Sequence, residues 1–144
     1  MLDLSAQTGP VIVTLLYIFV YYGAQINILR VKTALEREAK ARGEKFDRYF
    51  GQDRTLLAAD RMQLNMLEHM PPFLALLWLN AVFVGPMGAT VAGGIYVASR
   101  ASYPLLMGGR LGRGIPARIL VATVPGYGVL AYLAGALIVA LVQA

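Results

Sequence analysis

Four long runs of apolar residues set the pattern of this sequence. They cover residues 10–29, 62–84, 88–107 and 115–142, and none contains more than one Asp, Glu, Lys or Arg. A helix needs about 20 mostly apolar residues to cross the ~30 Å hydrocarbon core of a bilayer. Each run is long enough. The pattern therefore predicts an all-α fold, an integral membrane four-helix bundle in which residues 1–144 form a single domain.

The segments that connect these runs differ in length and charge. The turn around residues 85–88 is short and uncharged, whereas the glycine-rich loop 108–114 is basic. The long loop 30–61 holds 9 of the 13 Lys and Arg residues. Loops rich in Lys and Arg stay on the cytoplasmic side of a membrane. We therefore expect a multi-pass protein with both basic loops in the cytoplasm and both termini outside.

The long loop itself contains helical signals. Residues 33–42 combine helix-forming side chains with alternating charges, and Gly43 follows as a helix stop. A second helix is expected to start near Asp53 and to lead into the second apolar run. The first span should therefore continue as an exposed helix beyond the membrane.

Composition narrows the chemistry. The chain is 58% hydrophobic and 15% charged, against ~25% charged residues in an ordinary soluble domain. It has no cysteine and one histidine, His69, so disulfides, thiolate metal sites, a cysteine nucleophile and a multi-histidine metal site in one chain are excluded. We expect no metal. The net charge of +5 does not indicate nucleic acid, because the basic residues stand at the ends of apolar runs.

Polar residues gather at the start of the second run. Arg61, Asn65 and Glu68 are spaced i, i+4 and i+7, so they share one face of a helix. An unpaired carboxylate inside a membrane costs ~2.5 kcal/mol or more, so Glu68 should face protein. The third run adds Arg100 and Tyr103, which again share a face.

These residues favour a binding site near the cytoplasmic boundary. The expected site is a basic ring around Asn65 and Glu68, formed by Arg30, Arg61, Arg100, Arg110 and Arg113. Arginine forks bind carboxylates in bidentate fashion, and Glu68 could take an ammonium group. The alternative is purely structural, with Glu68 paired to Arg61 or Arg100 as a link between helices. We expect His69 to form a hydrogen bond between helices and Arg118 to reach the headgroups.

The string Arg61-x-Gln63-x-Asn65-x-x-Glu68-x-x-Pro71 resembles the signature of the MAPEG family, the membrane-associated proteins in eicosanoid and glutathione metabolism. Arg100-x-x-Tyr103, and Gln25 followed by Arg30, agree with it. The resemblance implies a homotrimer that binds glutathione as co-substrate between subunits. Position by position, it assigns glutathione contacts to Arg30, Arg61, Gln63, Asn65, Glu68 and Tyr103, and the helix face shared with Tyr103 adds Arg100.

The same resemblance implies a catalytic arginine that stabilises the glutathione thiolate. The matching position is Gly114, with Arg113 adjacent and Arg110 one helical turn earlier, so either arginine is a candidate. The chain departs from the family at His69 and Met107, where tyrosines often stand. These departures keep a non-catalytic role open.

The implied function is a glutathione transferase or peroxidase that attacks lipophilic electrophiles arriving from the lipid. Two alternatives remain: a non-catalytic membrane binding protein of the same fold, and a small proton-coupled multidrug transporter. The arginines around Glu68 count against the transporter, because a carboxylate that binds cations would not usually stand among arginines. The expected location is a bacterial inner membrane.

Overall fold

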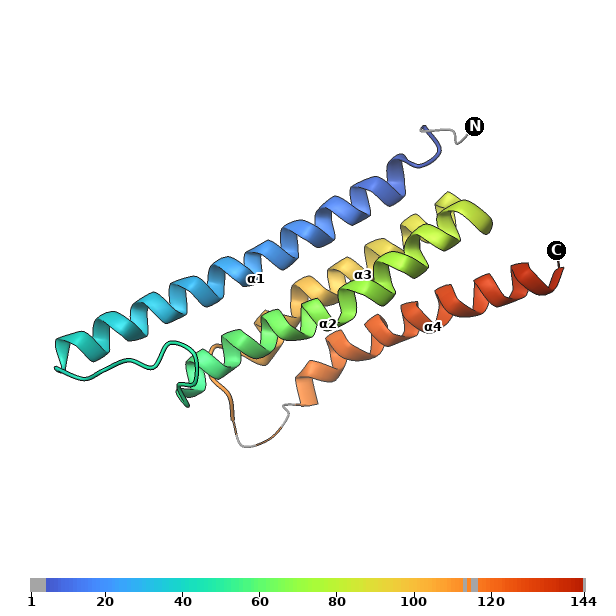
Figure 1. Cartoon of the computed structure of the whole chain (residues 1–144). Coiled ribbons are helices and arrows are strands. Elements are labelled where there is room, and N and C mark those ends of the chain that lie inside the picture. Colours follow the sequence, from blue (N-terminus) through green and yellow to red (C-terminus); the bar gives the residue numbers. More distant parts are fainter. Residues whose placement is uncertain (1–4, 113, 115–116, 144) are drawn as a thin grey trace.

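A computed structural model describes residues 5–112, 114 and 117–143. These residues form four long helices, α1 (Thr8–Ala41), α2 (Arg54–Phe83), α3 (Pro86–Met107) and α4 (Leu120–Gln143), with a short 3₁₀ turn η1 (Ala117–Ile119) before α4. The helices lie side by side, with both ends of the chain at the same end of the bundle (Figure 1). The predicted all-α four-helix bundle is confirmed.

Within the described residues, three segments are long and apolar enough to cross a membrane. They are α1, α2 and the stretch from Ala117 to Gln143. Helix α3 has 22 residues, but Arg100 and its other polar and glycine residues keep it out of this group. It packs against all three other helices, as expected for a helix that faces mostly protein. Its assignment as a fourth span remains a prediction.

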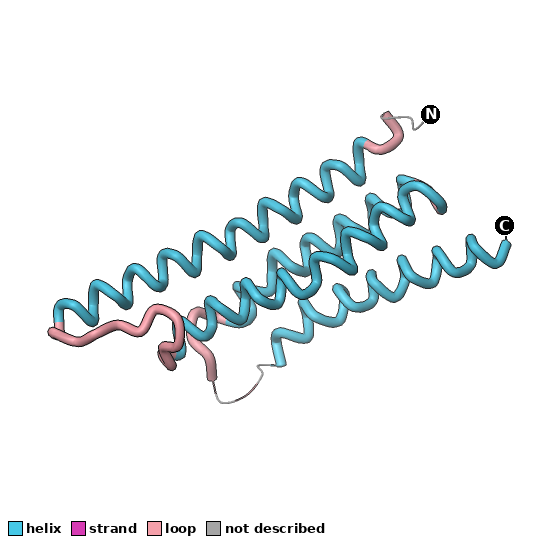
Figure 2. Tube along the Cα trace, viewed as in Figure 1, coloured by secondary structure: helices cyan, strands magenta, loops and turns pink. Residues whose placement is uncertain are grey.

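The helix boundaries follow local signals in the sequence. Helix α1 continues well past its apolar run, as predicted, and Gly43 with a φ of 72° follows its end. Asp53 caps α2, because its side chain accepts hydrogen bonds from the backbone amides of Thr55 and Leu56. The segment between them is a loop that turns back beside α1 (Figure 2). Pro86 stands in the first turn of α3, where its missing N–H is tolerated.

The core combines stacked aromatic rings with a few buried hydrogen bonds. Phe73 and Tyr96 stack with ring centroids 4.0 Å apart. The Tyr17 hydroxyl donates to the Met66 carbonyl at 2.7 Å, which ties α1 to α2. Asn80 donates to the Leu133 carbonyl at 2.8 Å and so links α2 to α4. These bonds satisfy polar groups that could find no partner in lipid.

Gly93 allows a close approach between α1 and α3. A Cβ atom at Gly93 would lie 2.6 Å from Val13 Cγ1 and 2.9 Å from Leu77 Cδ1, so the helices can approach only because no side chain is present. The neighbouring Gly94 has nothing within 4 Å of its Cβ position. Much of the remaining surface is apolar, with exposed residues such as Leu15 and Phe19 on α1. That surface suits contact with lipid.

Candidate functional site

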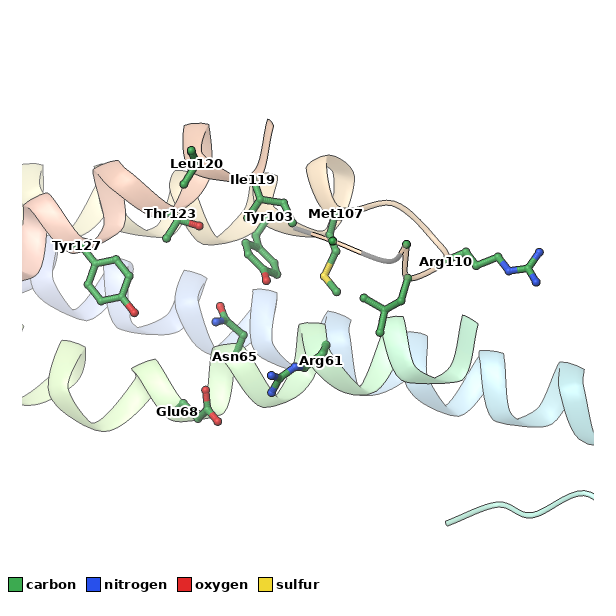
Figure 3. Close-up of a pocket in the computed structure, with 13 residues that line it drawn as sticks. Arg61, Asn65, Glu68, Tyr103, Met107, Arg110, Ile119, Leu120, Thr123 and Tyr127 are labelled. Atoms are coloured by element: carbon green, nitrogen blue, oxygen red, sulfur yellow. The ribbon is translucent and has the colours of Figure 1, made fainter. Parts of the chain in front are cut away.

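A cavity of about 360 Å³ opens between α2, α3 and α4 (Figure 3). It lies at the end of the bundle opposite the termini (Figure 1). This volume falls in the ~300–1,000 Å³ range of small-molecule sites. Its polar wall comes from α2 and α3, its apolar wall from α4, and its rim from the loop after α3. The lining residues are Arg61, Asn65, Glu68, Tyr103, Met107, Arg110, Leu111, Gly112, Gly114, Ile119, Leu120, Thr123 and Tyr127.

The three polar residues of α2 line the cavity together. Arg61, Asn65 and Glu68 lie along one side of the helix, as their spacing predicts. Arg61 and Glu68 are exposed, whereas Asn65 is half-buried. Among the described residues, the ion pairs are all in or near the loop between α1 and α2, and none includes Glu68. The alternative in which Glu68 pairs with Arg61 or Arg100 to join helices therefore has no support in the described part of the chain.

Two of the expected glutathione contacts, Arg30 and Gln63, do not line this cavity in a single chain. Arg30 is exposed on α1 and lines a separate shallow groove with Thr33 and Arg37. Gln63 points toward α1, with its Nε2 3.5 Å from the Tyr21 hydroxyl. Residues two apart on a helix do not share a face, which explains why Gln63 leaves the side occupied by Arg61. Their part in a site between subunits, as the family resemblance implies, stays a prediction.

Arg100 also lies outside the cavity, behind Asn65. Its side chain is 1% exposed, and its Nη1 donates to Asn65 Oδ1 at 3.0 Å. It points into the bundle because the face that it shares with Tyr96 is buried against α2 and α4. The expected i, i+3 pair with Tyr103 is thus divided, with Tyr103 at the cavity and Arg100 supporting its wall.

The arginines proposed for catalysis differ in position. Arg110 lines the rim of the cavity, but its side chain extends away from Arg61 and Asn65 (Figure 3). Arg113 lies outside the described residues. The loop is attached to α2 by a hydrogen bond from the Leu111 amide to the Arg54 carbonyl, at 3.1 Å. This bond keeps the rim close to the start of α2.

The sequence analysis missed the contribution of α4. Thr123 and Tyr127 both line the cavity, and their i, i+4 spacing near the basic loop was the available signal. His69 is buried and packs its ring edge-on against Tyr127, with centroids 5.1 Å apart. Its Nδ1 has no hydrogen-bond partner in the described chain, so the expected bond between helices is not found there. Arg118 Nη2 lies about 3.3 Å from the Cβ position of Gly108, and thus near the loop after α3.

We find no metal site in the part of the chain that the structure describes. No three His, Cys, Asp or Glu side chains there are grouped as metal ligands. The cavity instead offers two opposite charges and several hydrogen-bonding groups above an apolar wall. Such a set can bind a small zwitterionic or polyanionic molecule next to a lipophilic one.

Comparison with known proteins gives a family match. The sequence model of the MAPEG family matches residues 10–139. The match includes most of each of the four helices and every residue that lines the cavity. Among curated proteins, no sequence matches the chain.

Proposed function

Because this chain belongs to the MAPEG family of membrane proteins, we propose that it binds glutathione in the cavity and activates the thiol for attack on lipophilic electrophiles. The observation that carries the proposal is the α2 face of Arg61, Asn65 and Glu68. Both charged groups open onto the cavity, and Glu68 has no ion-pair partner among the described residues. Charges left unpaired at a membrane boundary indicate a ligand that completes them.

The charges match those of glutathione, which has two carboxylates, one ammonium group and one thiol. Arg61 can bind a carboxylate through its planar fork, and Glu68 can bind the ammonium. The two residues stand about 10 Å apart along the helix axis, from a rise of ~1.5 Å per residue. Asn65 lies between them, and Tyr103 lies on the opposite side of the cavity. Both side chains can hydrogen-bond to the peptide groups of glutathione.

The chemical step requires thiolate formation. A free thiol has a pKa of ~8.5, so little thiolate exists at neutral pH. An arginine that lowers this pKa by about two units stabilises the anion by ~2.7 kcal/mol. The candidates are Arg110 at the rim and Arg113 in the same loop. Arg118 is a further candidate, because it directly precedes the cavity residue Ile119 and lies near the loop.

We further propose a homotrimer in which neighbouring subunits complete the site. In one chain Arg30 lies away from the cavity, so an adjacent copy is the means by which such a residue could reach bound glutathione. Closed rotational symmetry would repeat this contact identically in each subunit. The orientation we propose keeps the basic loops and the cavity at the cytoplasmic side, in a bacterial inner membrane.

The electrophile is proposed to enter from the lipid. The cavity wall is apolar at Ile119 of η1 and Leu120 of α4, and Leu120 and Tyr127 are exposed on the surface of α4. A lipid-soluble molecule can therefore approach the polar half of the cavity without leaving an apolar surface. No protein nucleophile is needed, which suits a chain without cysteine.

The test is a calorimetric titration of the detergent-purified protein with glutathione in buffers of different ionisation enthalpy. Binding with release of about one proton per site supports thiolate formation, and conjugation assays with lipophilic electrophiles then follow. Binding without proton release favours the alternative of a non-catalytic binding protein. If millimolar glutathione produces no binding heat, the glutathione proposal is wrong.

Separate variants identify the arginine that acts on the thiol. Arg110→Ala, Arg113→Ala and Arg118→Ala are compared for proton release and for conjugation rate. The variant that keeps glutathione binding but loses proton release marks the thiolate-stabilising arginine. The transporter alternative instead predicts that Glu68→Gln alters cation-dependent drug resistance in cells and leaves glutathione binding absent in both proteins.

A further inference from the structure

Arg100 is a buried cation for which the described chain provides no acidic partner. Its Nη1 donates to Asn65 Oδ1, while its Nε and Nη2 are buried without a hydrogen-bond partner in the described chain. Leaving a guanidinium buried and uncompensated is costly. A purely structural role would be filled more cheaply by an apolar side chain, so the arrangement indicates a function.

Three helices fix the position of this guanidinium. It lies over the ring of Tyr96 on α3, 5.2 Å from the centroid. On α4, a Cβ atom at Gly126 would lie against Nη2 and 3.1 Å from Cζ. The Ser99 hydroxyl donates to the Ala122 carbonyl and holds α3 to α4 beside it. The glycine is therefore what allows the arginine to reach Asn65 on α2.

The hydrogen bond determines which side of the Asn65 amide faces the cavity. A guanidinium has only donors, so it must bind the carbonyl oxygen of the carboxamide. The amide NH₂ is then the group left for a ligand. A rotated amide would present its oxygen instead, which repels a carboxylate. Arg100 thus sets Asn65 as a donor, and its own charge adds to the attraction for an anion.

We propose that Arg100 is a positioning residue that acts through Asn65 to select free carboxylates in the ligand, an inference that rests on the proposed glutathione function. It contacts no ligand itself. Gly126 is part of the same arrangement, because a larger residue at this position displaces the Arg100 guanidinium. Selectivity should therefore depend on a residue of α4 that does not line the cavity.

The experiment measures Kd for glutathione and for its ethyl ester, in which one carboxylate is blocked. The variants are Arg100→Gln, Asn65→Ala, their double mutant and Gly126→Ala, with Gly128→Ala as the control. Gly128 is exposed on the same helix and has nothing within 4 Å of its Cβ position. We expect a roughly tenfold loss of affinity for glutathione in each single variant except the control. The preference over the ester should shrink in parallel.

The double mutant distinguishes positioning from an independent contribution. If Arg100 acts through Asn65, the double mutant loses about as much as Asn65→Ala alone. Additive losses, or an unchanged preference over the ester, overturn the inference. If Arg100→Gln does not fold, the Kd values of Gly126→Ala for glutathione and its ethyl ester test the inference instead. A wild-type protein that fails to bind glutathione overturns the proposed function instead, which is a separate result.

A second inference comes from the loop 42–53. Tyr49 and Phe50 are 80% and 82% exposed, and the Asp47 carboxylate accepts hydrogen bonds from both of their backbone amides. The loop turns back beside α1 instead of extending beyond it (Figure 1). Lys32 lies 5.9 Å from the centre of the Tyr49 ring, only three residues after the apolar run 10–29. The aromatic pair is thus near the expected membrane surface.

We infer that this aromatic pair, with the nearby Lys45 and Arg54, docks on anionic lipid headgroups. Aromatic rings are enriched at membrane interfaces, and basic residues beside them add attraction to anionic lipid. Both basic residues are exposed and lack an ion pair among the described residues. The surface therefore has both the charge and the apolar area that such docking needs.

Tryptophan fluorescence tests this docking. Trp78→Phe removes the only tryptophan, and Phe50→Trp places a reporter in the loop, with Glu38→Trp on the exposed part of α1 as control. In phosphatidylcholine vesicles with brominated acyl chains, we expect quenching at position 50 that increases with phosphatidylglycerol, and none at position 38. Red-shifted, unquenched emission overturns docking. Blue-shifted but unquenched emission also overturns it, and would place a second copy of the chain on the loop.

Discussion

The close approach of α1 and α3 can be tested by adding one methyl group. Gly93→Ala places a Cβ atom 2.6 Å from Val13 Cγ1 and 2.9 Å from Leu77 Cδ1. Both neighbours are buried in the core, so neither can move without displacing others. Overpacking of a core costs ~1–3 kcal/mol. Alanine in place of glycine within a helix returns ~0.5–1 kcal/mol, so we expect a net loss of about 0–2.5 kcal/mol.

The adjacent glycine provides the matched control. Gly94→Ala gains the same helix propensity, but its Cβ meets nothing within 4 Å. The difference between the two variants therefore isolates the packing cost, ~1–3 kcal/mol. Stability is measured by titrating dodecyl sulfate into mixed micelles and following the fluorescence of Trp78, which packs against the core. Equal stability of the two variants would refute the packing of α1 against α3 described above.

A third variant tests the identity of the neighbour. Val13→Ala removes the methyl group closest to the new Cβ atom, so the double mutant with Gly93→Ala should be more stable than the two single losses predict. Contacting residues typically show coupling energies of ~0.5–3 kcal/mol. Additivity would mean that the clash, if any, lies with another residue.

Three other predictions address the site, the polar core and the loop. Glu68→Gln should weaken glutathione binding tenfold or more in calorimetry, because the ammonium loses its charged partner. Asn80→Leu should lower stability by ~1–3 kcal/mol in the same titration, because a buried carbonyl of α4 loses its donor. Asp53→Ala should cost ~1 kcal/mol by loss of the helix cap. Backbone hydrogen bonds from Leu56 and Thr55 lower the pKa of Asp53, so its stabilisation is present above ~3.9 and disappears as pH falls through the lowered value. Unfolding curves of both proteins between pH 3 and 7 should therefore converge at the acid end.

The sequence was most informative where a local rule acts alone. Apolar run lengths predicted the helices, Gly43 predicted the end of α1, and Asp53 predicted the start of α2. The i, i+4, i+7 spacing placed Arg61, Asn65 and Glu68 on one face. Each inference needed only the geometry of a single helix, which the sequence determines directly.

The sequence determines less about features that depend on the rotation of one helix against another. Arg100 and Tyr103 share a face in sequence, yet only Tyr103 reaches the cavity. The family string placed Gln63 with the site residues, although helix geometry turns it toward α1. On α4, the i, i+4 spacing of Thr123 and Tyr127 was a weak signal, because that helix is apolar nearly all round.

The position of Arg100 shows how neighbouring helices shape the cavity. Its guanidinium donates a hydrogen bond to Asn65 in the cavity wall and does not line the cavity itself. Because lipid offers no water to solvate a misplaced charge, its burial must be compensated inside the protein. The space for it comes from Gly126, far along the chain and without a chemical group of its own. In a membrane bundle, a site is thus shaped by small residues on neighbouring helices as much as by its charged residues, and only packing reveals which glycine belongs to it.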